Sequence, residues 1–174
     1  MKPLSLLTAA SLFAFSSNAV ANSCNLTNAL LTGKWKLAQQ DLSHIEKAID
    51  EATDDMNFVI RGIARSRLES SNQADKSLDF SESEKSWLVS FEGKAPAPIS
   101  KSNGTLNWTS SENEKLKVKG NSSANKRSIE FIAEDGSKEI TFQCISENKL
   151  KSTIRVKSPK LPKDVVYSLI YEAQ

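Results

Sequence analysis

The spacing of hydrophobic residues predicts a long helix in the first half of the chain. From Leu42 to Leu68 apolar side chains recur every three or four positions, which is the spacing of an amphipathic helix. Asp41 precedes this segment as a capping residue, and acidic residues gather in its first half and arginines in its second, as the helix dipole favours. We therefore predict one helix over residues 42–68. Phe58 falls on its polar face, so we expect its second half to be covered on more than one side or to bend.

In the second half of the chain the hydrophobic spacing changes to a period of two, which predicts strands. Turn sequences such as Asn103-Gly104 and Asp135-Gly136 separate these strands at short intervals, as in an antiparallel meander. Residues 94–103 contain Pro96 and Pro98, so we expect this segment to form a flap or an edge crossing. The candidate strands cover residues 77–81, 86–92, 105–109, 114–120, 126–133, 138–145, 149–157 and 164–172.

These elements predict an α+β fold, with a long N-terminal amphipathic helix packed on a curved antiparallel sheet or small barrel of seven or eight strands. Alternation places Trp87, Val89 and Phe91 on one face of their strand, and it turns Cys144 toward the core. The sheet either wraps around the helix as a half barrel or closes with the helix at one end.

The first residues have the composition of a secretory signal peptide. Residues 1–21 contain Lys2, an apolar run and the sequence Ala19-Val20-Ala21, which is a small-x-small cleavage site. Cleavage after Ala21 leaves residues 22–174 as a single domain in the periplasm or outside the cell. No later apolar run approaches the roughly 20 residues that a membrane span needs, so we expect no transmembrane anchor. An uncleaved N-terminal anchor is the alternative.

The chain has two cysteines, Cys24 and Cys144. In an oxidising compartment we expect one bridge between them, and closing a loop of about 120 residues would stabilise the fold by up to roughly 4 to 5 kcal/mol. A reactive thiol or a metal ligand is the alternative, but His44 is the only histidine and no Cys-x-x-Cys pair is present. We therefore expect no metal and no cofactor.

Composition excludes one class of partner and gives no support to catalysis. Lys and Arg total 23 against 21 Asp and Glu, a net charge of +2, which is too small for sequence-independent binding of nucleic acid. The sequence contains no Gly-x-Ser-x-Gly motif, and a Ser-His-acid triad would depend on His44 alone. We therefore expect that the protein is not an enzyme.

The segment Thr32-Gly33-Lys34-Trp35-Lys36-Leu37 resembles the Gly-x-Trp signature near the start of lipocalin-like (calycin) proteins. The resemblance implies a secreted antiparallel barrel that carries a small apolar ligand. Residues 57–65, 158–162 and 167–171 are similar to segments of secreted bacterial proteins, which implies a location in the bacterial envelope and carries over no activity.

Two groups of residues are candidates for binding a ligand. Arg61 and Arg65 share a helix face near Phe58, an arrangement that holds a carboxylate or phosphate head beside an apolar tail; ion pairs with Asp54 and Glu69 are the alternative. The three tryptophans either line a pocket or form the core of the sheet, and they are Trp35, Trp87 and Trp108.

The sequence therefore predicts an exported, non-catalytic binding module for an apolar or amphiphilic ligand, such as a lipid, in a lipocalin-like pocket between sheet and helix. This hypothesis requires an internal cavity on the order of a few hundred Å³. The alternative is a solid-cored interaction or inhibitor protein that binds a protein of the bacterial envelope. It would act through residues 94–103 or a lysine-rich sheet face, and it predicts an exposed apolar patch.

Overall fold

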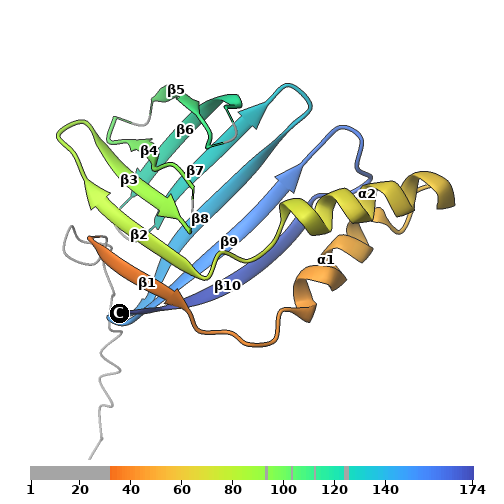
Figure 1. Cartoon of the computed structure of the whole chain (residues 1–174), viewed down its shortest axis with the longest axis horizontal. Helices are drawn as coiled ribbons and strands as arrows, with labels where there is room; N and C mark the ends of the chain where they lie inside the picture. Colours follow the sequence, from red (N-terminus) through yellow and green to blue (C-terminus); the bar gives the residue numbers. More distant parts are fainter. Residues whose placement is uncertain (1–31, 93, 103, 112, 124–125) are drawn as a thin grey trace, which may run out of the picture.

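The computed structural model describes residues 32–92, 94–102, 104–111, 113–123 and 126–174. The predicted signal segment and Cys24 lie outside these residues. Two helices follow the first strand, and nine further strands follow the helices (Figure 1). The helices are α1 (Ser43–Thr53) and α2 (Phe58–Ser71). The strands are β1 (Gly33–Leu37), β2 (Ser77–Glu82), β3 (Ser86–Phe91), β4 (Ala97–Ser100), β5 (Thr105–Thr109), β6 (Lys115–Ser123), β7 (Lys126–Ala133), β8 (Gly136–Ser146), β9 (Lys149–Lys157) and β10 (Val165–Ala173).

The strands form one antiparallel sheet in the order β4-β3-β2-β1-β10-β9-β8-β7-β6-β5. Strands that are neighbours in the sequence pair with each other, except that β1 pairs with β10 and no ladder joins β4 to β5. The sheet curls until β4 lies against β6, where the backbone nitrogen of Ser100 is 2.7 Å from the position of a Cβ on Gly120. The result is a nearly closed barrel, as the sequence-based fold class allowed, but with ten strands instead of seven or eight.

The two unpredicted strands have identifiable causes. Strand β1 is the segment that carries the Gly-x-Trp sequence, and it is only five residues long. Strand β4 lies in the segment predicted as a flap or an edge crossing, where Pro98 lacks a backbone N–H. Because β4 is at the edge of the sheet and has a ladder on one side only, a proline is tolerated there.

The prediction of one long helix over residues 42–68 is wrong, because the chain breaks between Thr53 and Phe58. The break contains Asp54, Asp55 and Asn57, whose short polar side chains compete for backbone hydrogen bonds. Asn57 is the N-cap of α2 and accepts a hydrogen bond from the backbone nitrogen of Val59 at 3.1 Å. The interruption is about one helical turn long, so the apolar period continues across it and conceals the break.

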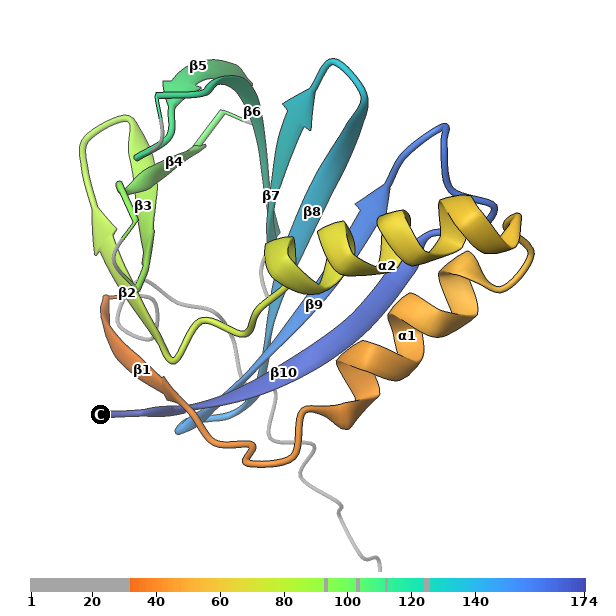
Figure 2. The same ribbon diagram turned by 45° about the vertical axis from the view of Figure 1, so that its right-hand side comes forward.

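The two helices lie side by side next to β9 and β10, and away from β5 (Figures 1 and 2). Helix α1 buries Ile45, Ile49 and Ala52 and contacts β10, where a ring nitrogen of His44 lies 2.9 Å from the carbonyl oxygen of Ser168. Helix α2 buries none of its residues. Neither helix is long and apolar enough to cross a membrane in the part of the chain that the structure describes.

The interior of the barrel is a packed core. One face of each strand points inward, and in the middle of the barrel these positions are fully buried, as for Val89, Ile129 and Leu150. The rings of Phe80 on β2 and Phe142 on β8 meet edge to face at 5.0 Å, so opposite walls touch. Each such side chain contributes about 1.5 to 3 kcal/mol by leaving water.

We expect Gly120→Ala to lower the free energy of unfolding by about 1 to 3 kcal/mol, because the new methyl group would overlap the backbone of β4. Gly62→Ala is the matched control. Its Cβ would meet no atom within 4 Å on α2, so we expect it to stabilise the protein by about 0.5 to 1 kcal/mol. Urea unfolding followed by tryptophan fluorescence measures both. Equal stability of the two variants would show that β4 does not close on β6 in solution.

Candidate functional site

A small cavity lies inside the barrel at the end that the helices cover, which we call the helix end. Side chains of β2, β3, β8, β9 and β10 line it, together with the connection between α2 and β2, residues 72–76. Its volume is about 10 Å³, on the order of a single water molecule. The expected cavity of a few hundred Å³ is therefore not open in this conformation. The lining residues are Gln73, Asp75, Leu78, Phe91, Lys138, Ile140, Ser152, Ile154, Tyr167, Leu169 and Tyr171.

Polar side chains enter this cavity because strand alternation carries them inward. On β8, Lys138 occupies the same face as Ile140 and Phe142, and on β10 Tyr167 and Tyr171 share a face with buried Leu169. Each strand thus supplies a polar group at the helix end of an otherwise apolar inward face.

Lys138 is the cation of this cavity. Its Nζ donates a hydrogen bond to the carbonyl oxygen of Ser71, the last residue of α2, at 3.1 Å. Burial lowers the pKa of Lys138 to about 8; the nearby charge of Lys94 acts in the same direction and that of Asp75 opposes it. The charged amine is therefore poorly compensated where it lies.

Two tyrosines hold the α2–β2 connection over the cavity. The hydroxyl of Tyr167 donates to the Oδ1 of Asn72 at 3.3 Å, and that of Tyr171 donates to the carbonyl oxygen of Asp75 at 2.9 Å. The carboxylate of Asp75 forms an ion pair with Lys94 at 2.7 Å. Burial raises the pKa of both tyrosines well above the usual range, so both remain neutral hydrogen-bond donors at physiological pH.

A second buried cation lies at the opposite end of the barrel. Arg127 on β7 points inward, and its guanidinium carbon lies 3.6 Å from the ring centroid of Trp87. Lys101 lies 5.0 Å from the same ring and forms an ion pair with Glu82 at 2.6 Å. Burial lowers the pKa of Arg127 to about 10, and the charge of Glu82 opposes that shift.

Aromatic rings lie beside Lys138 at the helix end, since Phe131 is its cross-strand neighbour and Phe91 lines the same cavity. Phe131 on β7 lies 6.3 Å from Phe91 and 5.3 Å from Trp108, measured between ring centroids. The indole N–H of Trp108 donates to the carbonyl oxygen of Pro96 at 2.9 Å, which ties β5 to the segment before β4.

The predicted headgroup residues lie on α2, outside this cavity. Arg61 forms an ion pair with Asp54 at 3.0 Å, and Arg65 forms one with Asp50 at 2.8 Å. Arg65 also lies 3.6 Å from Glu69, so both arginines adopt the ion pairing named as the alternative. Phe58 is 89% exposed and does not line the cavity at the helix end. Their predicted role in binding a ligand head remains a prediction.

The three tryptophans belong to the core or pack against it, which is one of the two arrangements predicted for them. Trp35 and Trp87 are buried in the core and Trp108 packs against it. Cys144 lies on the inward face of β8, as predicted, and is not free. Because Cys24 lies outside the described residues, the bridge remains a prediction. The part of the chain that the structure describes contains no cluster of residues able to hold a metal ion.

Lys138, Arg127 and the two tyrosines were not among the predicted site residues, although the sequence carried a signal for them. Extending the inward face of β8 back from Ile140 reaches Lys138, and extending that of β7 back from Ile129 reaches Arg127. A charged residue at an inward position of a strand costs free energy of folding unless the charge is paired and hydrogen-bonded, so such a position marks a candidate site.

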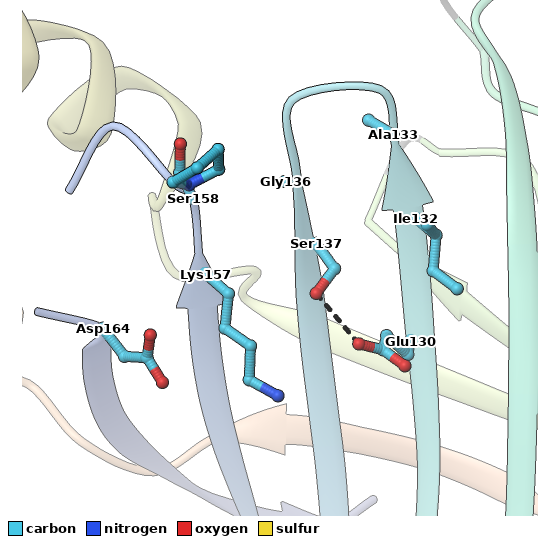
Figure 3. A pocket seen from close by; sticks show the side chains of 9 residues that line it. Glu130, Ile132, Ala133, Gly136, Ser137, Lys157, Ser158 and Asp164 are labelled. Carbon is cyan, nitrogen blue, oxygen red and sulfur yellow. Dashed lines mark hydrogen bonds between the residues drawn. The ribbon is translucent and has the colours of Figure 1, made fainter.

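A larger depression lies on the outer surface, where β7, β8 and β9 end beside the β9–β10 connection (Figure 3). Its volume is about 380 Å³, and Ser137 donates a hydrogen bond to Glu130 at 2.9 Å on its floor. The depression is broad and open to solvent. It offers no enclosed apolar surface for a ligand.

Comparison with solved structures identifies the architecture. The Echinococcus granulosus fatty-acid-binding protein 1 matches over 83% of this chain and 98% of its own, with a TM-score of 0.53 and 12% identity. The REP1-NXSQ fatty acid transporter matches over 84% and 97%, with a TM-score of 0.52 and 17% identity. The chain has a calycin-type fold. A Schistosoma mansoni fatty-acid-binding protein, solved with arachidonic acid, matches this calycin barrel over 84% and 97%, at a TM-score of 0.51 and 14% identity.

The calycin-type fold confirms what the Gly-x-Trp resemblance implied about architecture. No protein-family model matches the sequence, and no curated protein matches it significantly. At these identities the likeness establishes the arrangement of the backbone, and the function has to be argued from the residues of this barrel.

We expect Lys138→Met to raise the free energy of unfolding at pH 7 by about 1 kcal/mol, because it removes a poorly compensated buried charge. The pKa of Lys138 is about 8 in the folded protein and 10.5 in an ordinary lysine. Between these values the unfolded chain binds more protons, so wild-type stability rises relative to the variant as pH increases. Urea unfolding at pH 7 and pH 9.5 measures this. Lys117→Met, on the exposed outer face of β6, is the control; a pH-independent difference for Lys138→Met would contradict the prediction.

We expect Arg61→Ala and Arg65→Ala each to lower the free energy of unfolding by about 0.5 to 1 kcal/mol, because each removes a partly exposed ion pair. Arg67→Ala is the control, since Arg67 is exposed and forms no ion pair with the described residues. Thermal unfolding and ligand binding are measured on the same samples. Loss of ligand binding without loss of stability would instead support the predicted headgroup role.

Proposed function

We propose that this chain is an exported, non-catalytic binding module that holds a single-chain amphiphile, such as a fatty acid, inside the barrel. The observation that carries the proposal is the inward face of the calycin barrel, which is apolar along its length and polar only toward its ends. Such a lining suits a ligand with an alkyl chain and one polar head. The fatty-acid-binding proteins that share this architecture support the same ligand class.

Entry of a ligand requires movement, because the cavity at the helix end has a volume of only about 10 Å³. Helix α2 and the connection to β2 are the elements that move most readily. No residue of α2 is buried, and hydrogen bonds from Lys138, Tyr167 and Tyr171 to residues 71–75 attach its C-terminal end to the barrel. Each of these hydrogen bonds contributes about 1 kcal/mol to stability, so the free energy of lipid binding can offset their loss.

Exposed apolar side chains mark α2 as the entry side. Phe58, Val59, Ile60 and Ile63 are each more than half exposed, on the element that covers the mouth of the barrel. Apolar surface of this kind is uncommon on a soluble protein and favours contact with an apolar ligand on its way into the barrel.

The same exposed residues favour a second candidate function. A filled core with an apolar patch on α2 is what a solid-cored interaction or inhibitor protein of the bacterial envelope would present. Its partner would be a protein that covers Val59, Ile60 and Ile63. Crosslinking from α2 in an envelope extract distinguishes this function from lipid binding.

We place either function in the periplasm or outside the cell. The signal-like composition of residues 1–21 supports this location, as does the predicted bridge between Cys24 and Cys144. Fractionation of cells that produce the full chain, with mass measurement of the mature N-terminus, tests it. A mature chain that begins at Asn22 in the exported fraction is the expected result.

The lipid-binding proposal is tested by native mass spectrometry of residues 22–174, purified from an oxidising compartment without detergent, followed by organic extraction. We expect one co-purifying amphiphile per chain, or uptake of one decanoate molecule by the stripped protein. A mass equal to that of the bare chain after exposure to decanoate and to an envelope extract would contradict the proposal.

A substitution inside the cavity tests where the ligand lies. Ser152 is 3% exposed and lines the cavity, so we expect Ser152→Leu to fill the space and weaken decanoate binding by about tenfold or more. Ser90→Leu makes the same change on the outer face of β3 and is expected to leave the affinity unchanged. Calorimetric titration measures both, at a temperature where circular dichroism shows each variant folded. Equal affinities would place the ligand outside the barrel.

A further inference from the structure

The geometry points to Lys138 as the residue that binds the head of the ligand, and to a monoanionic carboxylate as that head. This inference rests on the proposed function and adds a position and a chemistry to it. The head would lie at the helix end of the barrel, under the α2–β2 connection, and the alkyl chain would extend from there into the apolar interior.

Lys138 has hydrogen-bonding capacity that its surroundings do not use. A lysine ammonium has three N–H donors, and Lys138 donates to the carbonyl oxygen of Ser71. Among the described residues no carboxylate lies within 4 Å of its Nζ, and Asp75, the acidic residue that lines the same cavity, is already paired with Lys94 at 2.7 Å. A ligand carboxylate would supply the counter-charge that this half-buried amine lacks.

The charges of the site select the charge of the ligand. The charged residues that line the cavity are Lys138 and Asp75, and the carboxylate of Asp75 is already paired with Lys94, which leaves the Lys138 charge without an ion-pair partner among the described residues. Tyr167 and Tyr171 complete the ionisable groups there, and both are neutral. One negative charge therefore neutralises the site, whereas a dianionic phosphate would leave an uncompensated charge in an apolar enclosure.

The donors that would bind the head are the donors that now close the mouth. Lys138, Tyr167 and Tyr171 all donate to acceptors on the same short stretch of chain, namely Ser71, Asn72 and Asp75. When α2 and the connection move aside, these three donors lose their partners together. A carboxylate offers two oxygens with about four lone pairs and replaces the lost acceptors. Binding of the head and closure of the mouth over the empty barrel are therefore mutually exclusive.

Arg127 does not offer an equivalent site. Its guanidinium carbon lies 3.6 Å from the ring centroid of Trp87, and the charge of Glu82 opposes the lowering of its pKa by burial. The interior around that end is filled, since Phe142, the cross-strand partner of Arg127, is fully buried. The position of the open space, small as it is, favours Lys138 over Arg127.

The test compares decanoate with 1-decanol, which has the same chain and a neutral head, by calorimetric titration at pH 7. We expect the wild-type protein to prefer decanoate by about tenfold or more, since a charge-assisted hydrogen bond is lost with the alcohol. Lys138→Met should weaken decanoate binding by that factor and leave 1-decanol unchanged, and Lys138→Arg should keep the preference. Lys117→Met, on the exposed outer face of β6, is the control, for which the wild-type preference should be retained.

A second measurement reports on the head directly. With decanoate labelled with ¹³C at the carboxyl carbon, the pH dependence of the bound signal gives the pKa of the ligand carboxylate. A lysine partner holds that pKa below its value in water, and Lys138→Met should remove the shift. A general loss of structure would not produce this change while 1-decanol still binds.

Two outcomes overturn the inference, and they are distinguishable. If Lys138→Met binds decanoate as the wild type does, the head lies elsewhere, Lys138 is not its partner, and the proposed lipid-binding function stands. If the wild-type protein binds neither decanoate nor 1-decanol, the proposed function fails and the inference fails with it.

Discussion

The barrel depends on the pairing of β1 with β10, which is the one ladder between strands far apart in the sequence. Trp35 pairs with Ala173 and Leu37 pairs with Tyr171, so the two ends of the described chain become neighbours. Every other ladder joins two strands that are consecutive in the sequence. The β1–β10 ladder joins the β1-to-β4 and the β5-to-β10 halves into one sheet. It also places the helices, which lie between β1 and β2, at one end of the enclosed space.

Enclosure gives the inward positions two different roles. Most are filled by apolar side chains that stabilise the fold by leaving water, and opposite walls meet at Phe80 and Phe142. Near the two ends the same positions carry Arg127 and Lys138, for which burial is unfavourable and lowers the pKa. Arg127 lies against Trp87, whereas Lys138 has one backbone acceptor under a helix with no buried residue. The helix end therefore holds a charged inward residue that the barrel compensates poorly.

The cover of the mouth and the polar site beneath it use one set of hydrogen bonds. Lys138, Tyr167 and Tyr171 attach the α2–β2 connection to the barrel, and the attachment is weak because α2 contributes no buried surface. Any ligand that satisfies the three donors competes with closure. The proposed binding function therefore requires these hydrogen bonds to open, because the cavity beneath them has a volume of only about 10 Å³.

The sequence by itself determined the local elements. Alternation located all but two strands to within a few residues, and a period of three to four located the helical region, because both patterns report which side of an element is buried. It did not determine the break near Asn57, since the apolar period continues across a gap of one turn. It also did not determine which residues meet at the site. Lys138, Tyr167 and Asp75 come from three separate stretches of the chain, and only closure of the sheet brings them to one cavity. Local spacing is set by neighbours in the chain, whereas a site is set by contacts among distant residues.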